Sequence, residues 1–100
     1  MASINPEPWQ VLEKLYEDDL ALYDAIEDEL DLILSIPADP RVRRHQYMST
    51  PPRFAHSVPR PAGIQDWMIL WRPERRPGGA IDVIVEYIGP DVLLGPEPSE

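Results

Sequence analysis

The sequence of residues 66–88, DWMILWRPERRPGGAIDVIVEYI, predicts two β-strands joined by a short hairpin. Apolar residues that recur at every second position are typical of a strand with one buried face. Asp66–Arg72 is the first predicted strand, Ala80–Ile88 is the second, and Pro73–Gly79 supplies the turn. Their apolar rows are Trp67, Ile69 and Trp71 on the first strand and Ile81, Val83, Val85 and Tyr87 on the second.

A third strand is predicted just upstream, over Arg53–Val58. One face of this strand carries Phe54, His56 and Val58. Successive strands joined by short loops usually pair antiparallel, so the three strands form one sheet. Residues Pro37–Pro52 are predicted to be a loop, and Met1–Glu7 a frayed end or a brief edge strand.

Residues before Pro37 show helical periodicity. Pro8 suits the first turn of a helix, where its missing N–H would have no helical partner. Asp18 or Asp19 can cap a second helix. One helix over Trp9–Ile36 is an alternative, but two helices folded as a hairpin are preferred, because a small core needs the first helix to pack back. The stripe of the second helix consists of Leu20, Tyr23, Ile26, Leu30, Ile33 and Leu34, with Asp24, Asp28 and Asp31 opposite.

The order of these elements predicts an α+β fold, in which an N-terminal helical hairpin packs on one face of a small antiparallel sheet of three to four strands. The wholly apolar face of Ala80–Ile88, which carries Ile81, Val83, Val85 and Tyr87, should meet the helices. We expect a single domain over residues 1–94 and a disordered tail over residues 95–100.

Composition excludes several classes of protein. The chain has 100 residues, no cysteine and two histidines, His45 and His56. A disulfide scaffold, a thiolate metal site and a histidine-rich zinc site are therefore excluded, and no cofactor is expected. No apolar run approaches the roughly 20 residues that span a bilayer, and no signal peptide is evident. The sequence thus predicts a cytoplasmic protein without a membrane partner.

Charge is divided along the chain. Residues 1–40 contain eleven acidic residues and one basic residue, and residues 41–76 contain eight arginines and two acidic residues. The net charge of −9 opposes tight binding to nucleic acid. The arginine segment is predicted either to pair with the acidic helix or to face phosphates or an acidic partner.

The element order and its local sequences resemble the RelE/ParE toxin superfamily of bacterial toxin–antitoxin systems. The resemblance spans about residues 9–92 and rests on Leu12–Leu15, Leu20–Ile36, Ala38–Arg41, Asp66–Trp71 and Ala80–Asp91. It departs from the family pattern at Met68, where the ribonucleases carry an arginine, and at Pro90 and Asp91, where a basic corner is usual.

This resemblance implies a growth-inhibiting toxin that blocks translation by cleaving mRNA at the ribosome and is neutralised by a cognate antitoxin. For such a metal-independent endoribonuclease, His56 and Arg72 are the predicted catalytic residues. Cations near His56 would lower its pKa and keep it a neutral base, and arginines would stabilise the phosphorane-like charge. The predicted substrate-binding residues are Arg53, Arg60, Arg75 and Arg76. Alternatively, His56 is a half-buried packing residue.

Two other functions stay open. The protein can be a non-catalytic interaction module of phage or plasmid origin, in which the acidic helix Glu17–Asp31 contacts a basic partner. It can also be a structural subunit whose exposed tryptophans are covered by neighbouring proteins.

Overall fold

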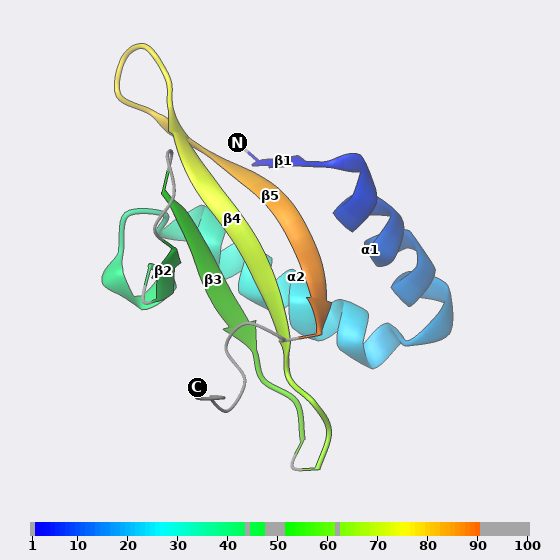
Figure 1. Ribbon diagram of the computed structural model, residues 1–100. Coiled ribbons are helices and arrows are strands. Elements are labelled where there is room, and N and C mark those ends of the chain that lie inside the picture. Colours follow the sequence, from blue (N-terminus) through cyan, green and yellow to red (C-terminus); the bar gives the residue numbers. More distant parts are fainter. Residues whose placement is uncertain (1, 44, 48–51, 62, 91–100) are drawn as a thin grey trace.

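The computed structural model describes residues 2–43, 45–47, 52–61 and 63–90. It combines two helices with a five-stranded sheet of strand order β1-β5-β4-β3-β2, in which β1 precedes the helices and the other strands follow them (Figure 1). The elements are β1 (Ala2–Ile4), α1 (Pro6–Asp18), α2 (Leu20–Ser35), the 3-10 helix η1 (Pro40–Val42), β2 (His45–Tyr47), β3 (Arg53–Val58), β4 (Trp67–Arg75) and β5 (Ile81–Pro90). The predicted α+β class is confirmed, whereas the tail predicted for residues 95–100 lies outside the described residues.

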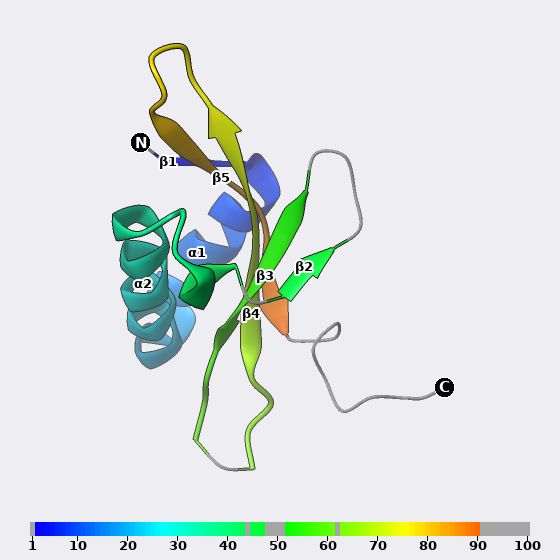
Figure 2. The same ribbon diagram turned by 90° about the vertical axis from the view of Figure 1, so that its left-hand side faces the viewer.

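The helical region is a hairpin of two helices, as preferred from the sequence. Asp19 separates them and caps α2, because its Oδ1 accepts a hydrogen bond from the backbone N–H of Leu22 at 3.2 Å. Both helices lie on the same side of the sheet (Figure 2). Neither described helix combines the length and the apolar character that crossing a bilayer requires.

The sheet contains the predicted antiparallel strands β3, β4 and β5 and two short edge strands. β1 pairs in parallel with β5, which makes the sheet mixed rather than antiparallel. β2 forms at His45–Tyr47, inside the segment predicted to be a loop, and pairs with β3. Five strands therefore replace the predicted three to four, because a three-residue strand takes its stability from its neighbour's free edge rather than from a pattern of its own.

A bulge in β5 overturns one predicted face. Leu70 pairs with Tyr87 and Trp71 pairs with Val85, so Glu86 has no residue opposite it. Such an extra residue reverses the alternation beyond it. Ile88 therefore joins the core, and the prediction that Tyr87 faces the helices is wrong. The Tyr87 hydroxyl donates a hydrogen bond to the Pro90 carbonyl, and a Cβ at Gly89 would lie 2.3 Å from that hydroxyl.

The core lies between the helices and the sheet. Trp71 on β4 is fully buried and lies 5.3 Å, centroid to centroid, from Phe54 on β3. The Arg43 guanidinium covers both rings, 5.0 Å from the Phe54 centroid. Ile26 and Ile33 of α2 are also fully buried. This packing fixes α2 over β3 and thereby sets the positions of the side chains that these two elements contribute to the candidate functional sites.

Candidate functional site

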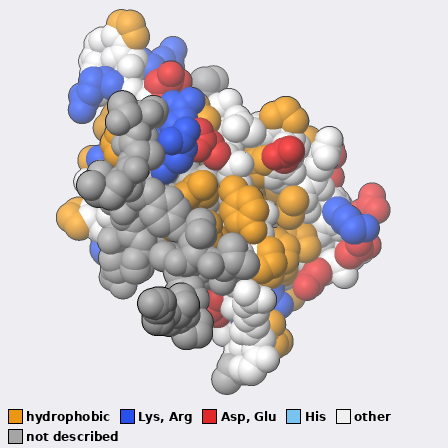
Figure 3. Space-filling view, viewed as in Figure 1, with side chains coloured by type: hydrophobic (Ala, Val, Ile, Leu, Met, Phe, Trp, Pro, Cys, Tyr) orange, Lys and Arg blue, Asp and Glu red, His pale blue; other side chains and the backbone are white. Residues whose placement is uncertain are grey.

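Two of the predicted arginines meet on the sheet face that the helices leave uncovered. Phe54, Trp71 and Val85 belong to the core, so the adjacent Arg53, Arg72 and Glu86 point the other way. Arg53 Nε donates to Glu86 Oε1, and Arg72 Nε donates to Glu86 Oε2 at 2.9 Å. Basic and acidic atoms lie side by side on this face (Figure 3). One carboxylate thus serves two guanidinium groups.

The environment of Glu86 favours its ionised form. Burial alone would raise its pKa, but hydrogen bonds and charge from Arg53 and Arg72 outweigh burial and lower the pKa below its usual value. The three side chains are largely satisfied by one another. We refer to Arg53, Arg72 and Glu86 as the arginine triad.

The other predicted substrate-binding arginines lie apart from the triad and from one another. Arg60 follows β3, at the end of the sheet opposite the β4–β5 hairpin (Figure 1), and its Nη2 lies 4.0 Å from Asp19 Oδ2. Arg75 is exposed at the end of β4. Arg76 Nη1 lies 3.6 Å from Asp82 Oδ1 across the hairpin. The structure therefore does not gather the predicted arginines into one phosphate site.

His56 lies on the helix-covered face, in a cavity between β3 and α2. Its Nε2 is 2.6 Å from Glu29 Oε1, and the two side chains are 12% and 26% exposed. The cavity has a volume of about 330 Å³ and is also lined by Leu32, Arg41, Ala55, Ser57 and Pro59. Arg41 pairs with Asp39 at 3.1 Å. A carboxylate, an imidazole and a guanidinium therefore border one accessible space.

The two predicted catalytic residues do not share a site. His56 points toward α2, whereas Arg72 points away from the helices and into the triad. No single phosphate group can contact both side chains in this fold. Arg41 is the arginine that borders the same cavity as His56. The catalytic roles of His56 and Arg72 stay predictions.

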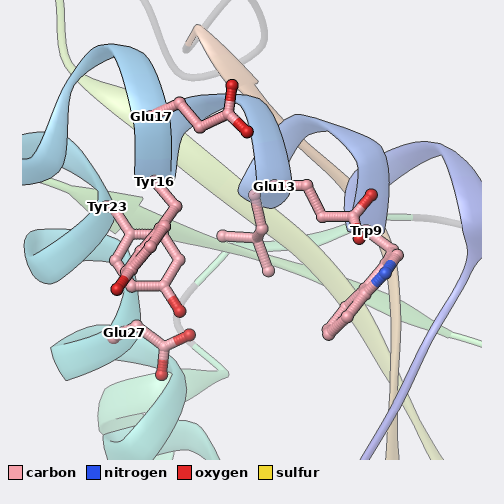
Figure 4. A pocket seen from close by; sticks show the side chains of 7 residues that line it. Trp9, Glu13, Tyr16, Glu17, Tyr23 and Glu27 are labelled. Carbon is pink, nitrogen blue, oxygen red and sulfur yellow. The ribbon is translucent and has the colours of Figure 1, made fainter.

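A second hollow lies between the two helices. This groove has a volume of about 580 Å³ and is lined by Trp9, Leu12, Glu13, Tyr16, Glu17, Tyr23 and Glu27. Tyr16 of α1 and Tyr23 of α2 meet edge to face with ring centroids 5.1 Å apart. Trp9 lies nearer the start of α1, and Figure 4 shows its ring on the opposite side of the hollow from the two tyrosine rings. We call this hollow the helical groove.

The helical groove carries negative charge. None of its described lining residues is basic, and three are glutamates. Lys14 lies on the same helix but pairs with Asp18 at 3.0 Å. The negative charge of the Glu27 carboxylate raises the pKa of the Tyr23 hydroxyl. The groove thus combines exposed aromatic rings with carboxylates.

Glu29 and the helical groove were not predicted from the sequence as functional features, for two different reasons. Glu29 follows Ile26 by three positions and precedes Ile33 by four, so it interrupts the buried stripe of α2. A carboxylate in such a stripe indicates that a polar side chain lies opposite it, on the element that packs against the helix. Trp9 and Tyr16 recur at helical spacing in the sequence, yet their side chains are 50% and 63% exposed.

Within the described residues, no three histidine, aspartate or glutamate side chains come together as ligands for a metal ion. Comparisons with protein-family models, curated proteins and solved structures found no match for this chain. The functional proposals therefore rest on the arginine triad, the His56 cavity, the helical groove and the order of the elements.

Proposed function

We propose that the protein is a toxin-like component of a bacterial toxin–antitoxin system that inhibits growth in the cytoplasm by cleaving mRNA at the ribosome. The observation that carries the proposal is the His56–Glu29 pair, which borders a cavity beside Arg41. The helical hairpin followed by the β3–β4–β5 meander also supports it, because that order underlies the resemblance to RelE/ParE toxins. A cognate antitoxin protein is the proposed neutralising partner.

The cavity supplies groups that metal-free RNA cleavage needs. Glu29 holds His56 at Nε2, so Nδ1 is the nitrogen that accepts the proton of the RNA 2′-hydroxyl. The 2′-oxygen then attacks the adjacent phosphorus, and the bond to the 5′-oxygen breaks while water protonates the leaving oxygen. Arg41 balances the charge that develops on the phosphoryl oxygens, at the cost of its pairing with Asp39.

Induced expression in a bacterial host tests this proposal through growth and bulk protein synthesis. We expect wild type to arrest growth and His56→Ala, Glu29→Gln and Arg41→Ala to relieve the arrest. Lys14→Ala is the control, because Lys14 is an exposed basic residue of α1 and does not line the cavity. Circular dichroism of each purified variant separates loss of function from loss of fold. Normal growth with wild type would refute the proposal, and relief by Arg72→Ala alone would move the site to the arginine triad.

The second candidate is a non-catalytic interaction module, and the helical groove favours it. Three glutamates without a described basic neighbour in the lining suit a basic partner rather than RNA. Abundant soluble protein, normal growth and no RNA cleavage by the purified chain would support this function over the toxin.

A further inference from the structure

We propose that the helical groove is the docking site for a partner-protein segment that presents an arginine or lysine flanked by apolar side chains. The groove lies on the outside of the helical hairpin, whereas the His56 cavity lies between α2 and β3. The inference therefore goes beyond RNA cleavage and stands whether or not the protein cleaves RNA.

Two of the three aromatic side chains of the groove are exposed in the isolated chain, and Tyr23 is partly buried. Trp9 is 50% exposed, Tyr16 is 63% exposed, and Leu20 beside them in sequence is 52% exposed. Large rings on the outside of a helix contribute little to folding but provide contact area for a partner at low entropic cost. A partner's apolar side chains would remove this surface from water.

The groove is ordered before any partner arrives. Tyr16 and Tyr23 hold each other edge to face, and Glu27 lies one helical turn beyond Tyr23 on α2 (Figure 4). Leu12, at the base of the groove, is buried in the core and fixes α1 at this point. A site that is already formed loses less entropy on binding than one that must close.

The charge of the lining selects the partner. A purely apolar segment would cover Glu13, Glu17 and Glu27 without compensating them, which is unfavourable. A phosphate or a nucleic acid would be repelled. An arginine or lysine satisfies both parts of the groove, because a cation is attracted to the face of an aromatic ring and to a carboxylate. A second copy of this chain is disfavoured by its net charge of −9.

Selection from a displayed library of random twelve-residue peptides tests the inference with a defined probe. We expect peptides selected on wild type to share an arginine or lysine with apolar neighbours. One selected peptide is then synthesised with its arginine intact and with citrulline, which keeps the shape and removes the charge. Binding is measured by the change in tryptophan fluorescence when the peptide is added. Of the three tryptophans, Trp71 is fully buried and Trp67 partly buried, so this change reports mainly on Trp9.

We expect citrulline, which lacks the positive charge of arginine, to weaken binding about tenfold or more. A tenfold change in affinity corresponds to about 1.4 kcal/mol. The variant Glu13→Gln/Glu17→Gln/Glu27→Gln should weaken binding of the arginine peptide to the same extent. The matched control is Asp24→Asn/Asp28→Asn/Asp31→Asn, which removes three charges from the exposed face of α2 outside the groove lining and should leave binding within about twofold.

Failure to enrich any peptide, enrichment of acidic peptides, or equal effects of the two triple variants would overturn the inference. These outcomes are independent of the growth assay. A protein that arrests growth but selects no basic peptide retains the toxin proposal and loses this one. A protein that selects basic peptides without arresting growth does the reverse.

Discussion

The arginine triad and the helical groove differ in whether their charged side chains have partners of opposite charge within the chain. In the triad, two arginines share one carboxylate, so each cation has an acidic partner within the chain although the group keeps one net positive charge. In the groove, three glutamates surround exposed aromatic rings, and no basic residue is among the described lining. The first arrangement is typical of an ion-pair network that stabilises the folded chain, and the second is typical of a surface that binds a partner of opposite charge.

This difference changes the meaning of the charge division along the chain. The basic segment suggested a phosphate site, yet Arg53 and Arg72 pair with Glu86, and Arg76 approaches Asp82. The arginines therefore pair with acidic residues of β5 as well as with Asp19 between the helices. The uncompensated charge remains on the helical hairpin, where a basic partner would find it.

Glu86→Ala is expected to produce the largest loss of stability. It leaves two guanidinium groups close together without their carboxylate on a partly buried face. Breaking such a network from one side costs about 2–3 kcal/mol of unfolding free energy. Chemical denaturation measures it, with Glu74→Ala as the control because Glu74 is exposed on the neighbouring strand. A loss below about 0.5 kcal/mol would mean that the triad is not a stabilising network.

Acid should erase part of the stabilisation by the triad. The pKa of Glu86 is lowered in the folded chain, so its contribution is present above the ordinary carboxyl pKa of about 4.3 and is lost as pH falls through the lower folded value. Wild type should therefore exceed Glu86→Gln by about 1–2 kcal/mol at neutral pH and lose that advantage below about pH 4. Denaturation at several pH values measures the difference. A constant gap across pH would contradict the lowered pKa.

Long elements with a clear period were predictable from the sequence. Asp18 or Asp19 could be named as the cap, because short acidic side chains follow one apolar stripe and precede the next, and the structure shows that Asp19 caps α2. The strands β3, β4 and β5 followed from alternation. β1 and β2 have three residues each, too few to show a period, and they depend on the free edges of β5 and β3. The bulge at Glu86 leaves no mark in the alternation, so Tyr87 was assigned to the wrong face.

The candidate sites were less predictable, because they join distant residues. His56 was recognisable as a proton-transfer candidate, but its partner Glu29 lies 27 residues earlier on another element. The faces of Arg72 and His56 could be read from alternation, yet their separation by the sheet requires knowing which face the helices cover. Trp9 and Tyr16 have the spacing of core residues, and only the second helix shows that they flank a groove instead.

Neutralising the groove should have the smallest effect on folding, and this sharpens its contrast with the triad. Glu13→Gln/Glu17→Gln/Glu27→Gln removes like charges from neighbouring turns, so we expect the free energy of unfolding to change by no more than about 0.5 kcal/mol. Denaturation beside Glu86→Ala compares the two regions directly. If the groove variant loses as much stability as the triad variant, the glutamates are structural, and the groove would no longer be a surface whose charge is free to serve a partner.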